Sequence, residues 1–338
     1  MIYEYNSILK PYIADFLNQK KSIVSDCHYA HYCGILQNFD AFIIEYGYED
    51  INFNEEQILC WIATLKLKRR TVNYYCSTLR VFFNFLSGYG FQPFAPPYIK
   101  EEKDYIAYGF SDTELKDIFS IADNYAFHLE RQSPDKPHHA KKYMYSEYEF
   151  PMLLRLLLGC GLRLEEASML KLKDVNLSND TLTIRKSKSN EYRFVPMHPS
   201  VADILAKYCT AIGLGAEPDA YIFPGTDFSR PIPSNCFRSY FNTVLKKAGI
   251  LPTERRKHER GPCLHCLRHA FAHRSFKNGV GEGWAVNDQI PWLSVYLGHS
   301  NLQETERYLN FNCELISDEI TPFDRYSTDL YPEVNFNE

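Results

Sequence analysis

The spacing of apolar residues predicts helices along most of the chain. In the first hundred residues, apolar side chains recur every three to four positions in two long segments, about 27–46 and 71–86. A third helix is predicted from Glu55 to Leu65, because Asn54 before it is a typical N-cap. The N-terminal part of the chain is therefore predicted to be a bundle of helices.

A stretch rich in Gly and Pro follows these helices and predicts an interdomain linker at 93–107. Ser111 and Glu114 form a capping box that restarts helical structure. Further helices are predicted at 147–170, 200–211, 234–248, 263–278 and 291–311. Between them, "TLTIRKSKSNEYRFVPM" has β-branched arms and a polar centre, as in a hairpin.

This pattern predicts a mainly α chain with two domains, a helical one over 1–92 and a mostly helical one with a small antiparallel sheet over 108–313. The length of 338 residues suits two domains, and 45% apolar with 23% charged residues is typical of a soluble globular protein. With no membrane-length apolar run and no secretion signal, a cytoplasmic protein is expected. Its ten cysteines are then expected to be reduced thiols.

The net charge of the chain is acidic, but the charge is unevenly distributed along the sequence. The total is −5, but residues 314–338 hold seven acids and one Arg and so contribute −6. The first 313 residues therefore carry a net charge of about +1, because −5 minus −6 is +1, and basic residues cluster within them. Local basic patches form a phosphate footprint, so the acidic total does not exclude nucleic acid.

The most basic stretch is "GPCLHCLRHAFAHR" at 261–274, which suits either a metal or a phosphate. On a helix, His265, Arg268 and His269 share one face, while Cys263 and Cys266 lie mostly among apolar residues. Zinc would require a second pair of ligands at matching spacing. The nearest candidate is His258, and no such pair is evident.

Four further residues are candidates for a phosphate-binding or catalytic site, although each has an ordinary structural explanation by itself. Arg163 follows a helix that ends at Gly161, where Glu165 or Glu166 would supply an ion-pair partner. Lys188 lies in the polar tip of the hairpin. His299 follows Gly298 at a helix end, and Tyr308 lies nine residues further on, in a chain with 25 tyrosines.

Taken in order, these segments resemble the tyrosine recombinases, the phage integrase family. The resemblance rests on "GLRLEEASMLKLKDV", "SKSNEYRFVP", "HCLRHAFAH" and "LGHSNLQETERYL". One short motif alone is a weak signal. These four segments contain five family motifs in order, namely Arg163, Lys188, His265-x-x-Arg268, Gly298-His299 and Tyr308, and that order is specific. The resemblance implies a core-binding (SAM-like) domain followed by a catalytic domain. The catalytic residues it implies are Arg163, Lys188, His265, Arg268, His299 and Tyr308.

Two guanidiniums suit phosphoryl transfer because each offers a planar fork of donors and stays charged, without a metal. The resemblance implies that Tyr308 attacks DNA and leaves a 3′-phosphotyrosine and a free 5′-hydroxyl. It further implies that Lys188 protonates the departing oxygen, that His265 acts in acid–base catalysis and that His299 binds a non-bridging oxygen. Neither a metal nor a nucleotide cofactor is expected.

"KLKRRT" at the start of the helix near residue 71 is either a solvated helix end or a phosphate contact. The candidate DNA-binding residues are Lys66, Lys68, Arg69, Arg70 and Thr71. The expected partners are double-stranded DNA at specific attachment sites and three further copies of the chain on that DNA, with a monomer or weak oligomer when free. Accessory DNA-bending or directionality factors and packing of the tail 314–338 on a neighbouring protomer are also considered.

Some features depart from the family pattern. The segment around 280–290 is longer than usual, so a loop that remodels the path to Tyr308 is expected. An additional arm-binding domain is not expected. The sequence predicts a site-specific recombinase of a mobile element, either a phage integrase or an integrase-like transposase. The alternatives are a type IB topoisomerase and a DNA-binding regulator without catalysis.

Overall fold

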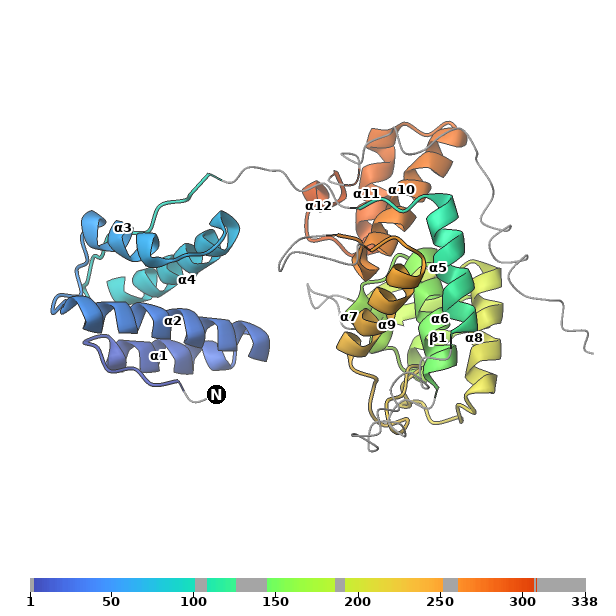
Figure 1. Cartoon of the computed structure of the whole chain (residues 1–338), viewed down its shortest axis with the longest axis horizontal. Coiled ribbons are helices and arrows are strands. Elements are labelled where there is room, and N and C mark those ends of the chain that lie inside the picture. The colour runs from blue at the N-terminus through green and yellow to red at the C-terminus, as the bar shows by residue number, and fades with distance from the viewer. Residues whose placement is uncertain are drawn as a thin grey trace, which may run out of the picture. The chain divides into compact units, whose positions relative to one another are not determined.

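The chain forms two compact units, Met1–Asp104 and Tyr105–Glu338 (Figure 1). The computed structural model describes residues 3–100, 108–125, 145–185, 192–251, 261–306 and 308. Lys188, His258 and the acidic tail 314–338 lie outside the described residues. The mainly α fold with one small antiparallel sheet, expected from the sequence, is confirmed.

The N-terminal unit is a bundle of four helices. They are α1 (Lys10–Lys21), α2 (Asp26–Tyr46), α3 (Glu55–Thr64) and α4 (Arg69–Ser87). Figure 1 shows α1 and α2 side by side below α3 and α4. Their apolar faces meet in an aromatic core, in which Phe16, Phe39, Trp61 and Phe82 are completely buried. Aromatic side chains bury about 150–250 Å² each, so these rings dominate the packing of the unit.

Helix α4 begins two residues before the predicted start at Thr71. Its N-cap is Lys68, so Arg69, Arg70 and Thr71 form the first turn, and all of them are exposed. Apolar periodicity begins only at Val72, which is buried, and a wholly polar first turn leaves no trace in that pattern.

The segment after α4 is fixed to that helix. The side-chain amide of Asn73 donates to the carbonyl of Ile99 at 2.7 Å and accepts from its N–H at 2.9 Å. Arg80 donates to the carbonyl of Pro96 at 2.7 Å. The described part of the Gly- and Pro-rich stretch is thus held on the N-terminal unit.

The second unit is built around a buried helix. It contains α5 (Asp112–Asn124), α6 (Ser146–Gly159), α7 (Leu164–Ser168), α8 (Pro199–Ala211), α9 (Ser234–Lys247), α10 (Leu264–Gly281), α11 (Val286–Leu297) and α12 (Leu302–Glu306). Helices α5, α8 and α10 all pack against α6. Residues 152–158 of α6 are all buried, as expected for a helix that is surrounded by others.

The helical segments predicted at 147–170 and 291–311 each contain a helix end that was expected, at Gly161 and at Gly298, and the structure confirms both ends. The predicted helix at 147–170 is divided into α6 and α7 at Gly161, which has a left-handed φ of 60°. The predicted helix at 291–311 is divided into α11 and α12 at Gly298, with a φ of 65°. Glycine adopts this conformation without steric cost, so both residues end a helix although the apolar spacing continues past them.

The small sheet contains the predicted hairpin and one strand that the sequence pattern did not indicate. Strands β1 (Val175–Asn176), β2 (Thr181–Ile184) and β3 (Arg193–Pro196) pair in this order, all antiparallel. Leu182 lies opposite Val195, and both are buried. The tip of the β2–β3 hairpin, which contains Lys188, is outside the described residues.

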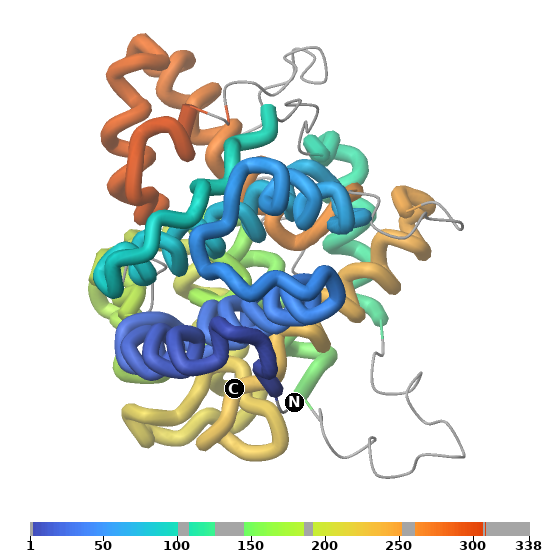
Figure 2. Tube along the Cα trace, turned by 90° about the vertical axis from the view of Figure 1, so that its left-hand side faces the viewer, coloured from blue at the N-terminus to red at the C-terminus, as the bar shows by residue number. Residues whose placement is uncertain are grey.

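The loop expected around 280–290 is mostly helix. Helix α10 continues to Gly281 and α11 begins at Val286, so only a short turn separates them. Figure 2 shows α10 and α11 as a helical hairpin, in agreement with the contacts between them. No helix among the described residues is both long and apolar enough to cross a membrane.

Candidate active site

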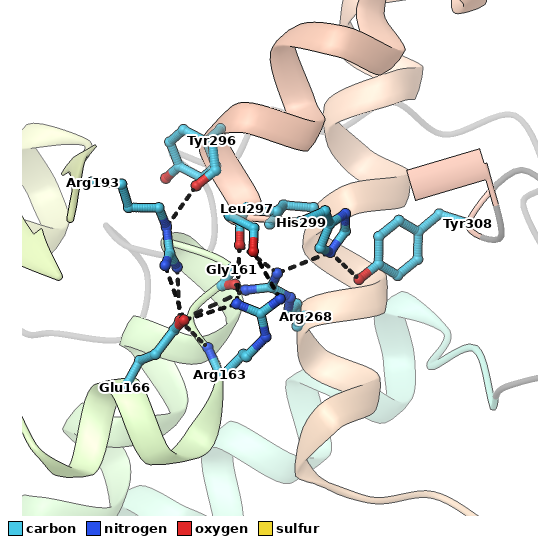
Figure 3. Close-up of polar contacts among 10 residues, drawn as sticks. Gly161, Arg163, Glu166, Arg193, Arg268, Tyr296, Leu297, His299 and Tyr308 are labelled. Carbon is cyan, nitrogen blue, oxygen red and sulfur yellow. Dashed lines mark hydrogen bonds and ion pairs between the residues drawn. The ribbon is translucent and has the colours of Figure 1, made fainter. Parts of the chain in front are cut away.

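Arg163 and Arg268 reach the same place from different elements (Figure 3). Arg163 is the N-cap of α7, and its Nη2 donates to the carbonyl of Gly298 at 3.0 Å. Arg268 lies in α10, and its Nη2 donates to the carbonyl of Leu297 at 2.7 Å. Its Nη1 donates to the carbonyl of Gly161 at 2.6 Å. The two helix-ending glycines therefore help to fix the positions of both guanidiniums.

Arg268 is not part of an exposed basic face. Only 1% of it is exposed, and it is among the largest fully buried side chains. Burial lowers the pKa of Arg268, and nearby Tyr308 and Glu166 oppose this shift. A guanidinium stays charged even so, and a buried charge requires compensation from its surroundings.

Glu166 supplies this compensation. Its carboxylate accepts from Arg163 Nη1 at 2.9 Å and lies 3.8 Å from Arg268 Nη1. Burial raises the pKa of Glu166, but hydrogen bonds and charge from Arg193 and Arg163 outweigh burial, and the pKa lies below its ordinary value. The sequence left Glu165 and Glu166 open as partners of Arg163, and the structure gives that position to Glu166.

Arg193 belongs to the same network, and the sequence reasoning missed it. From β3 it donates two hydrogen bonds to Glu166, at 2.9 and 2.7 Å, and a third from Nε to the carbonyl of Tyr296 at 2.9 Å. Its place on an exposed hairpin arm looked ordinary in the sequence. The one available signal was its position in "SKSNEYRFVP", five residues after Lys188.

Tyr308 and His299 are in contact. The Tyr308 hydroxyl lies 3.4 Å from His299 Nε2, and Arg268 Nη2 lies 3.0 Å from the same nitrogen. An arginine can only donate, so Nε2 is an acceptor here and the ring proton is on Nδ1. Nδ1 lies 2.6 Å from the hydroxyl of buried Thr305, which the sequence reasoning also missed.

The electrostatics of the site keep His299 neutral. Burial and the nearby charges of Arg268, Arg163 and Arg193 lower the pKa of His299 to about 3. A neutral imidazole next to two guanidiniums is a hydrogen-bond acceptor with little tendency to hold a second proton. His299 is therefore suited to orienting a hydroxyl or a phosphate oxygen.

Two more histidines of α10 extend from Tyr308 towards the surface. The His269 ring centroid lies 4.9 Å from that of Tyr308 and 4.7 Å from that of His265. Burial, together with His265 and Arg268, lowers the pKa of His269 to about 3. His265 itself is exposed. It lies one helical turn before His269 and further from Tyr308, so it stands at the rim of the site.

The structure brings together four of the six candidate catalytic residues, namely Arg163, Arg268, His299 and Tyr308. His265 stands at the rim, and Lys188 is outside the described residues. The candidate DNA-binding residues Lys66, Lys68, Arg69, Arg70 and Thr71 are all exposed and belong to the N-terminal unit. Among the described residues, no three His, Cys, Asp or Glu side chains are arranged to hold a metal ion.

Comparison with known proteins adds independent evidence. The family model described as "Phage integrase family" matches residues 134–314. A "Tyrosine recombinase" from Pseudothermotoga lettingae is 27% identical over 311 residues, covering 88% of this chain and 91% of that protein. "Tyrosine recombinase XerD" from Rickettsia conorii is 25% identical, covering 89% and 91%.

Solved structures agree on the fold. The XerH site-specific recombinase bound to difH substrate superposes with a TM-score of 0.65 at 15% identity, over 91% of this chain and 95% of that one. A lambda integrase dimer bound to a COC′ core site gives 0.63 at 16% identity, over 92% and 98%. Since the family model covers more than half of the 338 residues, this chain belongs to the phage integrase family and is a tyrosine recombinase.

Proposed function

We propose that this recombinase cuts DNA with Tyr308 of the same protomer whose Arg163 and Arg268 bind the scissile phosphate. The observation that carries this proposal is that one nitrogen, His299 Nε2, contacts both groups. It lies 3.4 Å from the Tyr308 hydroxyl and 3.0 Å from Arg268 Nη2. A phosphate held by the arginines would then lie next to the phenol. In this arrangement Tyr308, His299 and Arg268 all come from one protomer.

The hydrogen bonding of Arg268 supports a phosphate here. Its buried Nε–H has no acceptor among the described residues, and such a donor costs about 1–3 kcal/mol when left unpaired. A phosphate oxygen would supply that acceptor. Arg163 and Arg268 would then stabilise the charge that develops on phosphorus, in positions fixed beforehand by backbone carbonyls.

The proton of Tyr308 must leave during attack. In the absence of DNA, His299 accepts a long hydrogen bond from the phenol, and such bonds tighten when substrate is present. Because its pKa is about 3, His299 is a poor base, which leaves the acid–base role to His265 at the rim. For His299 to donate to a non-bridging oxygen, as the family resemblance implies, its proton must move from Nδ1 to Nε2. Thr305 would then donate to Nδ1, and Arg268 Nη2 would turn from Nε2 to the phosphate.

The remaining roles follow the family. Lys188 protonates the 5′-oxygen as the phosphorus–tyrosine bond forms, leaving a 3′-phosphotyrosine, and rejoining reverses the step. Because the phosphodiester bond is conserved on the protein, no nucleotide cofactor is consumed. The predicted domain 1–92 clamps DNA through Lys66, Lys68, Arg69, Arg70 and Thr71, and the predicted domain 108–313 performs the cleavage.

The substrate is double-stranded DNA at attachment sites of a mobile element, bound by four copies of the chain in the cytoplasm. XerH and lambda integrase, which share the fold, are described as bound to DNA, the latter as a dimer. The tail 314–338 packs on a neighbouring protomer and couples the active sites. Removing the residues after Asn312 should weaken synapsis, and unchanged synapsis would contradict this coupling.

Covalent trapping tests the proposal. On a nicked suicide duplex, the wild-type protein should form a DNA-linked product that resists denaturation, and Tyr308→Phe should bind the duplex without forming it. A linked product from Tyr308→Phe would contradict the assignment. Relaxation of a plasmid that lacks attachment sites would favour topoisomerase activity, and DNA binding without any linked product would favour a regulator.

A further inference from the structure

One motif is not used by the function proposed above. Cys263 and Cys266 flank His265 at the start of α10, and their Sγ atoms lie 3.6 Å apart. Cys263 is the exposed N-cap of the helix, whereas Cys266 is only 1% exposed. Among the described residues, no three metal-ligating side chains gather there.

We propose that Cys263 and Cys266 are a redox-sensitive thiol pair, and that a hydroperoxide converts them to a disulfide that suppresses DNA cleavage. The inference rests on the proposed function, because it depends on α10 carrying His265 and Arg268 into the active site. An accessible sulfur beside a buried one, three residues apart at a helix start, is the arrangement of Cys-x-x-Cys redox motifs.

The chemistry balances without a metal. The Cys263 sulfur attacks the O–O bond of the hydroperoxide, which gives a sulfenic acid and releases an alcohol, or water from hydrogen peroxide. The Cys266 sulfur then displaces hydroxide from the sulfenic acid, and the S–S bond forms. The two sulfurs lose two electrons to the peroxide bond, and the two thiol protons leave in the alcohol and in water.

The order of attack follows from exposure. Cys263 is accessible to a small oxidant, and the N-terminal end of a helix stabilises negative charge. A hydrogen bond with Cys263 and burial both raise the pKa of the Cys266 thiol, so Cys266 stays protonated until it reacts with its neighbour. Cys263 is thus the sulfur attacked by oxidant, and Cys266 is the resolving thiol.

The bond would disturb the catalytic helix. The present Sγ separation of 3.6 Å must shorten to about 2.05 Å, which draws the N-cap and the first turn of α10 together. His265 lies between the two cysteines in the sequence. Arg268 follows two residues after Cys266, and its Nη1 is held 2.6 Å from the carbonyl of Gly161. A displacement of about 1 Å in an active site costs up to about 100-fold in rate.

The test compares the reduced and peroxide-treated full-length protein on the nicked suicide duplex. Oxidation should lower the rate of covalent product formation at least about tenfold and leave DNA affinity within about threefold, with full recovery after dithiothreitol. Peptide mass mapping should show a Cys263–Cys266 disulfide. Cys263→Ser should cleave as well as the reduced wild type and resist peroxide, because serine is a good N-cap and the variant should fold.

A matched control is the double variant Cys27→Ser, Cys313→Ser, which should remain as sensitive to peroxide as the wild type. The inference is overturned if no Cys263–Cys266 disulfide forms, if the disulfide forms with cleavage unchanged, or if Cys263→Ser is equally inhibited. Absence of cleavage by the reduced wild type would instead count against the proposed function, so the two failures are distinguishable.

Discussion

Arg193 and Glu166 form a buried ion pair with two parallel hydrogen bonds, at 2.9 and 2.7 Å. Only 10% of the Arg193 side chain and 2% of the Glu166 side chain are exposed. The pair joins β3 of the hairpin to α7, and Glu166 holds Arg163 as well. The hairpin arm next to Lys188 is therefore linked to the arginines of the proposed phosphate site.

Replacing Arg193 should slow cleavage without removing a group that touches DNA. Arg193→Gln loses the charge, and Arg193→Lys keeps the charge but loses the planar fork, so both should reduce single-turnover cleavage by about 10- to 100-fold. DNA affinity should change little. The matched control is Arg238→Gln, because Arg238 pairs with Glu165 at 3.1 Å on the surface. Wild-type cleavage by both Arg193 variants would refute the positioning role.

Removing the carboxylate of Glu166 should destabilise the second unit. Glu166→Gln leaves Arg163, Arg193 and Arg268 without a counter-charge, and breaking a buried pair in this way costs about 3–5 kcal/mol. Urea unfolding at pH 7 measures the loss. Glu165→Gln is the control, since a pair that is 58% and 63% exposed contributes below about 1 kcal/mol.

The stability that Glu166→Gln loses should decrease as the pH falls. The folded state holds the pKa of Glu166 below its ordinary value of 4.5, so its contribution to stability is present above that pH and is lost as the pH falls. The gap between the wild type and Glu166→Gln should be largest near neutral pH and shrink below about pH 4.5. A gap that grows on acidification would contradict this.

Gly298 should tolerate no side chain, for two separable reasons. Its φ is 65°, and an added Cβ would lie 2.8 Å from Arg193 Nη1. Gly213 has a φ of 67° but nothing within 4 Å of an added Cβ, so Gly213→Ala measures the backbone cost alone, about 1–3 kcal/mol. Gly298→Ala should lose more stability in urea unfolding and also slow cleavage. Equal losses would mean that the contact with Arg193 is unimportant.

Glu149 should make the second unit less stable as the pH rises. Its side chain is 0% exposed, and its carboxyl oxygens have no hydrogen-bond partner in the part of the chain that the structure describes. Burial raises its pKa from 4.5 to about 9. Between these values the unfolded chain releases the proton while the folded chain keeps it, so stability falls with pH by on the order of 1 kcal/mol per unit.

Glu149→Gln should abolish this slope. Unfolding by urea at pH 6 and pH 8 measures it, with the exposed Glu217→Gln as the control that keeps the wild-type slope. If the wild type and Glu149→Gln respond identically to pH, Glu149 does not titrate as a buried group.

Arg70 should contribute to DNA affinity independently of sequence. It is exposed in the first turn of α4, and a phosphate contact there releases condensed counterions. Arg70→Ala should weaken binding to specific and random duplexes alike. It should also reduce the salt dependence of log Kd by about 0.9, the value for one phosphate. Lys21→Ala, at the exposed end of α1, should leave that slope unchanged, and an unchanged slope for Arg70→Ala would exclude the contact.

The sequence alone determined the helical class, the hairpin and the family. Apolar spacing located α2 and α3 within one or two residues, because their buried faces run the length of each helix. Apolar spacing missed the polar first turn of α4, and it continues past Gly161 and Gly298, where the glycines themselves indicated the helix ends. Motif order singled out Arg163, Arg268, His299 and Tyr308, and the fold brings these four side chains together.

Only the tertiary structure decided how these residues are supported. Glu166 and Arg193 are 27 positions apart, and Thr305 looked like any polar helix residue, so no local pattern could assign their contacts. Arg268 shares a helix face with the exposed His265 but is itself buried, because α11 ends against it and supplies a carbonyl acceptor. Burial and long-range pairing arise from the packing of distant segments, and hydrophobic periodicity reports only which side of its own element a residue occupies.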